Sequence, residues 1–270
     1  MSSAPVASQE PVAFDVADGV ATIELRRPER LNAYTEEMGE RLLELVESAR
    51  TRDDIRVVVI RGAGRAFCAG ADLKVDRPTR FDGTQEIASG LRRRDNPLMS
   101  ALRRLPKPVV AAVNGPAVGI GASLALSCDL VVAHEDAYFL FAFINVGLGP
   151  DGGPSALLPS NLSLVRAAEL LMLGRRLPAR DALSWGLVNR VFGAAEFDDA
   201  VRDFVAPLAS GPGLALANIK QELRTWAQPG FEQQLELEAR LQQERIAGSD
   251  DFAEGVAAFR EKRPARFSGR

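Results

Sequence analysis

Two glycine-rich segments are the parts of this 270-residue chain best suited to chemistry. Residues 62–73 read Gly-Ala-Gly-Arg-Ala-Phe-Cys-Ala-Gly-Ala-Asp-Leu, and residues 114–122 read Asn-Gly-Pro-Ala-Val-Gly-Ile-Gly-Ala. Neither segment ends in Gly-Lys-Ser/Thr and neither has the spacing of a dinucleotide fingerprint, so neither is expected to cradle phosphates. Either segment alone is consistent with an ordinary turn. Together they predict two backbone N–H groups that converge on developing negative charge, as in an oxyanion hole.

The side chains that titrate near these segments are few. Asp151, in Leu-Gly-Pro-Asp-Gly-Gly at 148–153, is one such acid, and Pro-Asp-Gly is a common turn sequence. His134 is the only histidine and is expected at an exposed strand end, without a catalytic role. Cys68 stands between Phe67 and Ala69, which favours a buried thiol over a nucleophile. No metal site is predicted from these residues.

Strands and helices alternate along the part of the chain that must position these residues. We expect strands at 12–14, 20–25, 57–60, 109–113, 130–133 and 138–141, and helices at 36–50 and 120–127. A turn at 17–19 should join the first two strands as a hairpin, and Thr35 should cap the first helix. This order predicts the α/β class with parallel pairing and active-site loops between elements.

Three regions divide the chain. Residues 1–11 are expected to form a flexible tail, 12–196 a catalytic core, and 197–270 a helical region with three helices, one of them a charged helix over 231–246. Residues 77–96 are rich in Arg, Asp, Gly and Thr and are expected to form a mobile loop over the site. The run Arg92-Arg93-Arg94, by contrast, is expected to be a solvated helix face.

Charge and composition exclude several classes of protein. The net charge is −3, so no basic field is available to bind nucleic acid. Cys68 and Cys128 are too few and too far apart for a disulfide scaffold, and the N-terminus lacks the features of a signal peptide, so a cytoplasmic location is expected. The longest apolar run, 108–126, is interrupted by Asn114, Gly115 and Pro116, and is expected to be core rather than a membrane span.

Both glycine-rich segments resemble the signature of the crotonase superfamily, the enoyl-CoA hydratase/isomerase family. Further matching sequences lie at 27–33, 147–153, 182–188 and 254–263, so that the resemblance covers roughly residues 12–267. It implies a spiral of ββα units with a C-terminal helical region used in oligomerisation, as a homotrimer or a hexamer. It also implies an acyl-CoA thioester substrate and no cofactor, since CoA is part of the substrate.

The resemblance assigns roles to individual residues. The two oxyanion amides fall on Ala71 and Ile120. Phe259 and Lys262 would come from a neighbouring subunit, with Lys262 reaching a phosphate. The remaining residues that the resemblance implies in substrate binding are Arg30, Leu31, Ala69, Asp72, Leu73, Ser123, Phe143 and Gly147.

This sequence departs from the pattern of the hydratases at two positions. Enoyl-CoA hydratases carry a glutamate on the helix of the second motif and another further along, and these positions are Ser123 and Phe143 here. Neither side chain acts as a general base near neutral pH. Asp151 matches a proton-transfer position of some isomerases of the family, which favours isomerisation of an enoyl-CoA.

Two alternatives to isomerisation remain open. Hydration would need a second acid, which the loop at 77–96 could supply. A non-catalytic trimer that binds acyl-CoA would retain the fold and the glycine-rich loops without the two glutamates.

Overall fold

A six-stranded sheet in the order β1-β2-β3-β4-β6-β9 forms the centre of the computed structural model, which describes residues 10–75 and 78–270. β1 pairs with β2 antiparallel, and the other neighbours are parallel. A second sheet has the order β5-β7-β8. The strands are β1 (Val12–Ala17), β2 (Val20–Leu25), β3 (Val57–Gly62), β4 (Val109–Val113), β5 (Ala117–Val118), β6 (Leu130–His134), β7 (Tyr138–Leu140), β8 (Leu177–Pro178) and β9 (Arg190–Phe192).

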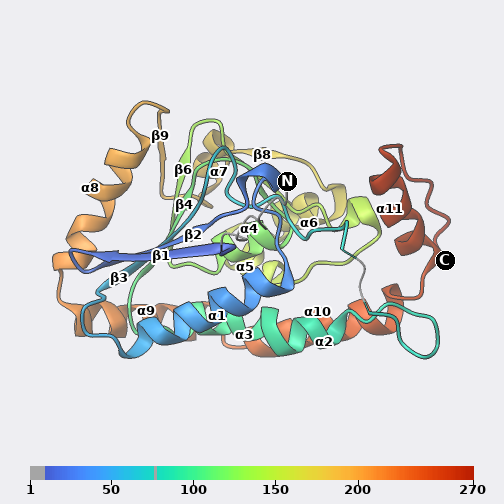
Figure 1. Cartoon of the computed structure of the whole chain (residues 1–270), viewed down its shortest axis with the longest axis horizontal. Helices are drawn as coiled ribbons and strands as arrows, with labels where there is room; N and C mark the ends of the chain where they lie inside the picture. Colours follow the sequence, from blue (N-terminus) through green and yellow to red (C-terminus); the bar gives the residue numbers. More distant parts are fainter. Residues whose placement is uncertain (1–9, 76–77) are drawn as a thin grey trace, which may run out of the picture.

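Helices cover the sheets and continue to the C-terminus (Figure 1). The α-helices are α1 (Glu36–Thr51), α2 (Ala88–Gly90), α3 (Asn96–Arg104), α4 (Ile120–Leu126), α5 (Pro154–Asn161), α6 (Leu164–Leu173), α7 (Ala179–Trp185), α8 (Phe197–Ser210), α9 (Gly213–Ala227), α10 (Phe231–Leu241) and α11 (Asp250–Glu261). Two short 3-10 helices are η1 (Pro28–Arg30) and η3 (Ile144–Val146), and two π-helical segments are η2 (Leu91–Asp95) and η4 (Gln242–Ile246). The α/β prediction is confirmed.

Local signals explain the first elements. Asp18 and Gly19 both have positive φ, 50° and 79°, as a two-residue hairpin loop between β1 and β2 requires. Thr35 caps α1, because its hydroxyl accepts the N–H of Met38 at 3.2 Å. The predicted hairpin and the predicted helix cap are therefore confirmed.

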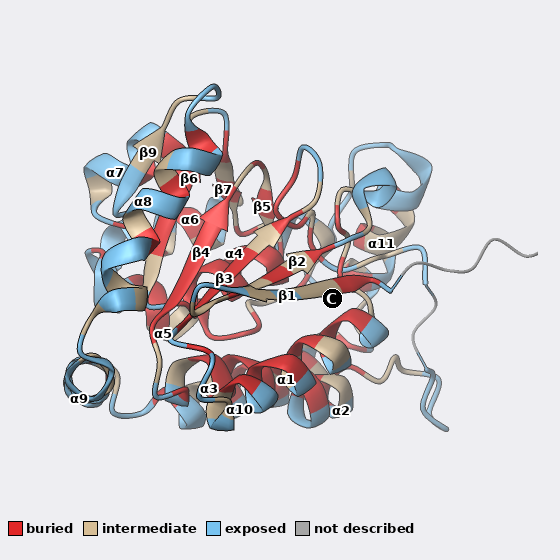
Figure 2. Ribbon diagram, turned by 60° about the vertical axis from the view of Figure 1, so that its left-hand side comes forward, coloured by how far each residue is buried: buried red, intermediate tan, exposed pale blue. Residues whose placement is uncertain are grey.

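The central strands are buried on both faces of the sheet (Figure 2). In β3, Val58 and Ile60 join the main hydrophobic core with α1 and α3, whereas Val57 and Val59 face a smaller cluster with α8. This alternation follows from the two-residue period of a strand. A continuous β-branched run is the sequence that such a strand needs.

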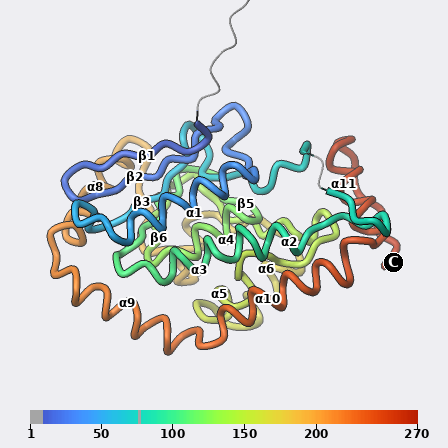
Figure 3. Tube along the Cα trace, turned by 60° about the horizontal axis from the view of Figure 1, so that its bottom comes forward, coloured from blue at the N-terminus to red at the C-terminus, as the bar shows by residue number. Residues whose placement is uncertain are grey.

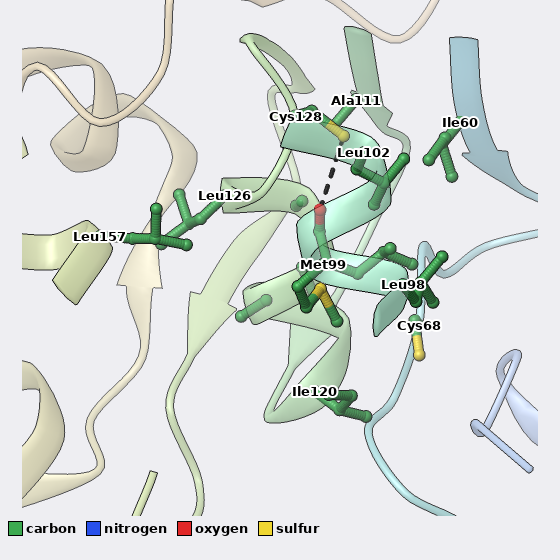
Figure 4. Packing of buried hydrophobic residues seen from close by; sticks show 14 of the residues in the cluster. Ile60, Cys68, Leu98, Met99, Leu102, Ala111, Ile120, Leu126, Cys128 and Leu157 are labelled. Atoms are coloured by element: carbon green, nitrogen blue, oxygen red, sulfur yellow. Dashed lines mark hydrogen bonds between the residues drawn. The ribbon is translucent and has the colours of Figure 1, made fainter. Parts of the chain in front are cut away.

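α3 and α4 pack together in the main core (Figure 4). Leu98, Met99 and Leu102 of α3 and Ile120 of α4 are buried there. The Cys128 thiol follows α4 and donates to the carbonyl of Leu124 at 3.5 Å. This core fixes α4, and with it the loop that begins the second glycine-rich segment.

The prediction of a loop over 77–96 is wrong for much of that segment. Arg77 lies outside the described residues, and residues 88–96 are helical, in α2, η2 and the start of α3. Arg94 is buried rather than solvated, and its guanidinium pairs with Asp95 at 2.8 Å and with Glu36 at 2.7 Å. Arg92 and Arg93 are exposed on this helical segment, as predicted for a solvated helix face.

The C-terminal region contains four α-helices, α8 to α11, rather than three. Figure 3 shows the chain passing from α8 through α9 to α10 along one edge of the molecule. The charged helix predicted over 231–246 divides into α10 and the π-helical segment η4. Residues 1–9 of the predicted tail lie outside the described residues, so that prediction is untested.

Candidate active site

Hydrogen bonds join the two glycine-rich segments side by side. The N–H of Val118 donates to the carbonyl of Cys68 at 2.8 Å, and the N–H of Cys68 donates to the carbonyl of Pro116 at 3.0 Å. At Gly121 a side chain would come within 2.6 Å of Cys68, so only glycine permits this approach. The segments therefore reach the same place, as their sequences predict.

The N–H of Ala71 points away from Tyr34, whose backbone pairs with this part of the first glycine-rich segment. Tyr34 and Ala71 form a parallel bridge, in which the Tyr34 N–H donates to Gly70 at 2.8 Å and the Asp72 N–H donates to Tyr34 at 2.9 Å. Backbone groups of successive residues in an extended chain point in opposite directions. Since the carbonyl of Gly70 and the N–H of Asp72 face Tyr34, the N–H of Ala71 faces the opposite side.

Ile120 supplies the second N–H. Gly119 turns the chain into α4 with φ 51° and ψ −122°, a conformation available to glycine, and Ile120 is the first residue of that helix. The carbonyl of Pro116, four residues earlier, accepts from Phe67 and Cys68. The N–H of Ile120 is thus one of the first-turn donors that a helix leaves without an intrahelical acceptor, at its positive end.

Both amides belong to residues that line one cavity of about 360 Å³. Most of the wall is apolar, with Phe143 and Leu148 from the segment after β7 and Ala258 from α11. The predicted site residues that line it are Ala69, Ala71, Leu73, Ile120, Phe143, Asp151 and Phe259. An apolar pocket with two convergent backbone donors suits a thioester whose carbonyl oxygen becomes negatively charged.

Asp151 is the carboxylate in this wall among the described residues, and it is 8% exposed. Its own carbonyl accepts the hydroxyl of Ser123 at 2.7 Å. At Gly152 a side chain would meet Ser123 at 2.9 Å and Ile120 at 3.0 Å, so the Asp151 turn packs tightly on α4. The start of α4 thus contacts the turn that carries the acid.

The two positions where hydratases carry glutamates contribute in other ways. Ser123 is fully buried and donates to the Asp151 backbone, and it does not reach the cavity wall described above. Phe143 is buried and lines the cavity near Gly119, where an added side chain would lie 3.8 Å from its ring. These residues shape the site without titrating.

Arg30, Leu31 and Asp72 lie beside the cavity rather than in its wall. The carbonyl of Leu31 accepts the Ala69 N–H at 3.0 Å, which holds the first glycine-rich segment. Asp72 pairs with Arg27 at 3.1 Å. Burial opposes ionisation of Asp72, but the hydrogen bonds from Arg27 and from the Lys74 N–H lower its pKa overall. Arg30 is exposed at the end of η1. Their roles in CoA binding stay predictions.

Phe259 lines the cavity of its own chain, and a contribution of Phe259 from a neighbouring subunit stays a prediction. α11 lies against η3, where an added side chain at Gly255 would come within 2.5 Å of the Val146 backbone. Gly147, next to η3, packs on α11 in the same way, because an added side chain there would lie 2.7 Å from the Asp251 carbonyl. Gly147 therefore docks α11 and does not line the cavity. Lys262 ends α11 with φ 56° and is exposed.

Cys68 agrees with its sequence context, whereas the His134 side chain, at 18% exposure, is less exposed than predicted. Cys68 is fully buried, and burial raises the pKa of its thiol to about 12. His134 ends β6, with its ring edge-on to Phe197 at 5.4 Å. Among residues 10–75 and 78–270, no three His, Cys, Asp or Glu side chains gather as metal ligands. No helix of those same residues is long and apolar enough to cross a membrane.

Sequence reasoning missed part of the wall. Leu140 and Ala142 line the cavity, whereas Phe139 and Phe141 are fully buried in the core. Arg263, from the segment after α11, also lines the cavity. The two-residue alternation through 139–142 indicates that Leu140 and Ala142 share one face of the segment and that Phe139 and Phe141 share the other. The sequence could not show which of the two faces lines the cavity, because that depends on the second sheet.

Comparison with known proteins gives the family. Residues 15–270 match the sequence model of the enoyl-CoA hydratase/isomerase family. The chain is 40% identical over 256 residues to the 1,2-epoxyphenylacetyl-CoA isomerase of Escherichia coli (strain K12), which covers 94% of this chain and 97% of that protein.

Solved structures agree. An enoyl-CoA hydratase from Mycobacterium avium subsp. paratuberculosis K-10 superposes with a TM-score of 0.86 and 38% identity, over 96% of this chain and 98% of that one. An enoyl-CoA hydratase/isomerase from Pseudoalteromonas atlantica T6c superposes with a TM-score of 0.84 and 32% identity, over 96% of this chain and 100% of that one. The chain belongs to the enoyl-CoA hydratase/isomerase family and has the crotonase fold, as the motifs predict.

Proposed function

We propose that this protein isomerises an enoyl-CoA thioester by moving a double bond along the acyl chain. The observation that carries the proposal is the presence of Asp151 in the same cavity wall as Ala71 and Ile120. CoA belongs to the substrate, and no further cofactor takes part in this chemistry.

Proton transfer by one carboxylate is sufficient for this reaction. The thioester oxygen accepts hydrogen bonds from the N–H groups of Ala71 and Ile120. The Asp151 carboxylate removes a proton from one carbon, and the electron pair shifts through the conjugated system onto the carbonyl oxygen. The resulting carboxylic acid returns the proton to the other carbon, and the dienolate collapses to the isomeric enoyl thioester. A single oxyanion donor is typically worth about 3 kcal/mol of transition-state stabilisation.

Hydration is supported less well than isomerisation. It requires a positioned water and usually a second acid, and Ser123 and Phe143 provide neither. Residues 78–96, part of the segment expected to supply that acid, contribute nothing to the described cavity wall. Phe143, Leu148 and Val146 instead make the wall apolar, which keeps water from the enolate.

Asp151→Asn is the direct test of the proposal. We expect kcat for double-bond migration in a 3-enoyl-CoA to fall about 10²- to 10⁴-fold, because the amide cannot take the proton. Asp136→Asn, at an exposed position, is the matched control and should retain activity. Unchanged turnover in Asp151→Asn would refute the shuttle. Binding without turnover in the native chain would favour a non-catalytic acyl-CoA-binding protein.

The substrate panel should include short, long and ring-bearing thioesters, each assayed separately for water addition and for double-bond migration. A ring-bearing thioester is included because the Escherichia coli relative is named as an isomerase of 1,2-epoxyphenylacetyl-CoA. The cavity volume of about 360 Å³ favours small acyl groups in this panel.

We also infer a homotrimer or hexamer in the cytoplasm. α9 is largely exposed (Figure 2), and it displays Leu214, Ile219, Leu223 and Trp226 with 51 to 86% exposure. Apolar side chains gathered on one helix favour burial against another chain. The free buried thiols of Cys68 and Cys128 suit a reducing compartment. Sedimentation velocity should give a species of three or six chains, and a monomer would contradict the assembly.

A further inference from the structure

Side chains of α10 and η4 hydrogen-bond to the turn that carries Asp151. The Gln242 side chain donates to the carbonyl of Gly149 at 2.7 Å. The Glu238 carboxylate accepts the N–H of Gly153 at 2.8 Å and the N–H of Ser155 at 3.2 Å. Hydrogen bonds from the C-terminal region thus fix residues on both sides of Asp151.

Glu238 is a buried acid that the proposed reaction does not use. It is 4% exposed, and its carboxylate also accepts the hydroxyl of Ser155 at 2.5 Å. The Gln234 amide donates to the same hydroxyl oxygen at 2.7 Å, so the Ser155 proton is directed at Glu238. A buried acid with three donors around it is an organised site rather than a chance contact.

We propose that Glu238 is a positioning residue for Asp151, holding the 149–155 segment so that the Asp151 carboxylate stays in the cavity wall. This inference rests on the proposed function. Glu238 does not itself line the cavity, and it acts through two backbone N–H groups. Gly153 packs tightly on the Phe231 ring of α10, since an added side chain at position 153 would lie 2.6 Å from that ring. This close packing allows the hydrogen bonds from the turn to reach Glu238.

Both carboxylate oxygens are needed for this role. Oε2 accepts from Gly153, and Oε1 accepts from Ser155. A glutamine offers one acceptor oxygen and turns an NH2 group toward the other donor. The same loss occurs when Glu238 binds a proton, because one oxygen then becomes a donor.

Protonation of Glu238 falls in the working pH range. Burial raises the pKa of Glu238 to about 7, and the hydrogen bonds from Ser155 and Gly153 act in the opposite direction. Ser155 faces it from α5, and Gln234 lies on its own helix. Among the described residues, no charged side chain contributes to this shift. We therefore expect kcat to fall as pH drops below about 7.

Glu238→Gln tests the proposal, with Glu236→Gln as the matched control on the exposed face of α10. At pH 8 we expect kcat of Glu238→Gln to fall tenfold or more, with KM within about twofold and the acid limb near pH 7 lost. An unchanged kcat would overturn the proposal. Parallel losses in kcat and in substrate affinity would also overturn it, since they indicate general disruption.

Ser155→Ala provides an independent test if Glu238→Gln fails to fold. Removing the Ser155 hydroxyl removes a hydrogen bond that stabilises the charged carboxylate, so the pKa of Glu238 should rise. The acid limb of kcat should then move to higher pH, and an unmoved limb would overturn the proposal. Asp151→Asn separates the two claims, because full activity in that variant refutes the proposed function, whatever Glu238 does.

Discussion

Ser123 and Phe143 replace the hydratase glutamates with residues that perform other tasks in this site. The Ser123 hydroxyl donates to the backbone of Asp151 at 2.7 Å, and Phe143 closes the apolar wall near Gly119. Ser123 packs closely on Gly152, where an added side chain would lie 2.9 Å from Ser123. The two substitutions therefore fit a site with one acid, and they are packed into it.

At position 120 the backbone and the side chain can be separated by substitution. Ile120→Pro removes the N–H at the first position of a helix, where proline is well tolerated. We expect kcat/KM for isomerisation to fall about 10²- to 10³-fold, the effect of losing one oxyanion donor. Ile120→Val retains the N–H and should change activity less than tenfold. Equal activity in the two variants would show that this amide does not bind the oxyanion.

Sequence alone could predict the elements whose signals are local. β3 and β4 are continuous apolar runs, and α1 combines the Thr35 cap with an apolar stripe that includes Leu42 and Val46. It could not predict the burial of Arg94, since its partner Glu36 is far away in sequence. Glu238 was missed for the same reason, because the donors that it accepts from lie on a distant turn. Single-sequence patterns do not reveal such long-range polar pairs.

The η2 segment supports the first glycine-rich loop through Tyr34. The buried Tyr34 hydroxyl donates to the buried carboxylate of Asp95 at 2.8 Å. The Tyr34 backbone pairs with Ala71. Burial, followed by the charge of Asp95, raises the pKa of Tyr34 well above its ordinary value, so this hydroxyl stays neutral.

Tyr34→Phe should therefore lower the free energy of unfolding by about 1 to 3 kcal/mol, because Asp95 loses a buried donor. The loss should be the same at pH 6 and pH 9, since the hydroxyl does not titrate there. Urea unfolding measures it, and Tyr138→Phe in the partly exposed strand β7 is the control. A loss no larger than that of the control would contradict the support assigned to Tyr34.

The stability of the whole chain should depend on pH through Glu238. Its folded pKa of about 7 lies above the ordinary value of 4.5. The folded state therefore binds more protons between these values, and stability falls as pH rises from about 4.5 to about 7, then levels off. The contribution is on the order of 3 kcal/mol at most.

Urea unfolding at pH 5 and pH 8 checks this expectation. The native chain should lose more stability between the two pH values than Glu238→Gln, which has no carboxyl group to titrate. Equal losses in the two proteins would show that burial of Glu238 does not raise its pKa.

The central claim is that the Ala71 and Ile120 amides polarise a thioester carbonyl. Difference infrared spectroscopy of a bound saturated acyl-CoA, labelled with ¹³C at the carbonyl, measures that polarisation without turnover. We predict that the carbonyl band shifts to lower wavenumber than in water, and that Ile120→Pro loses part of this shift. A band at the aqueous position in the native protein would contradict the account.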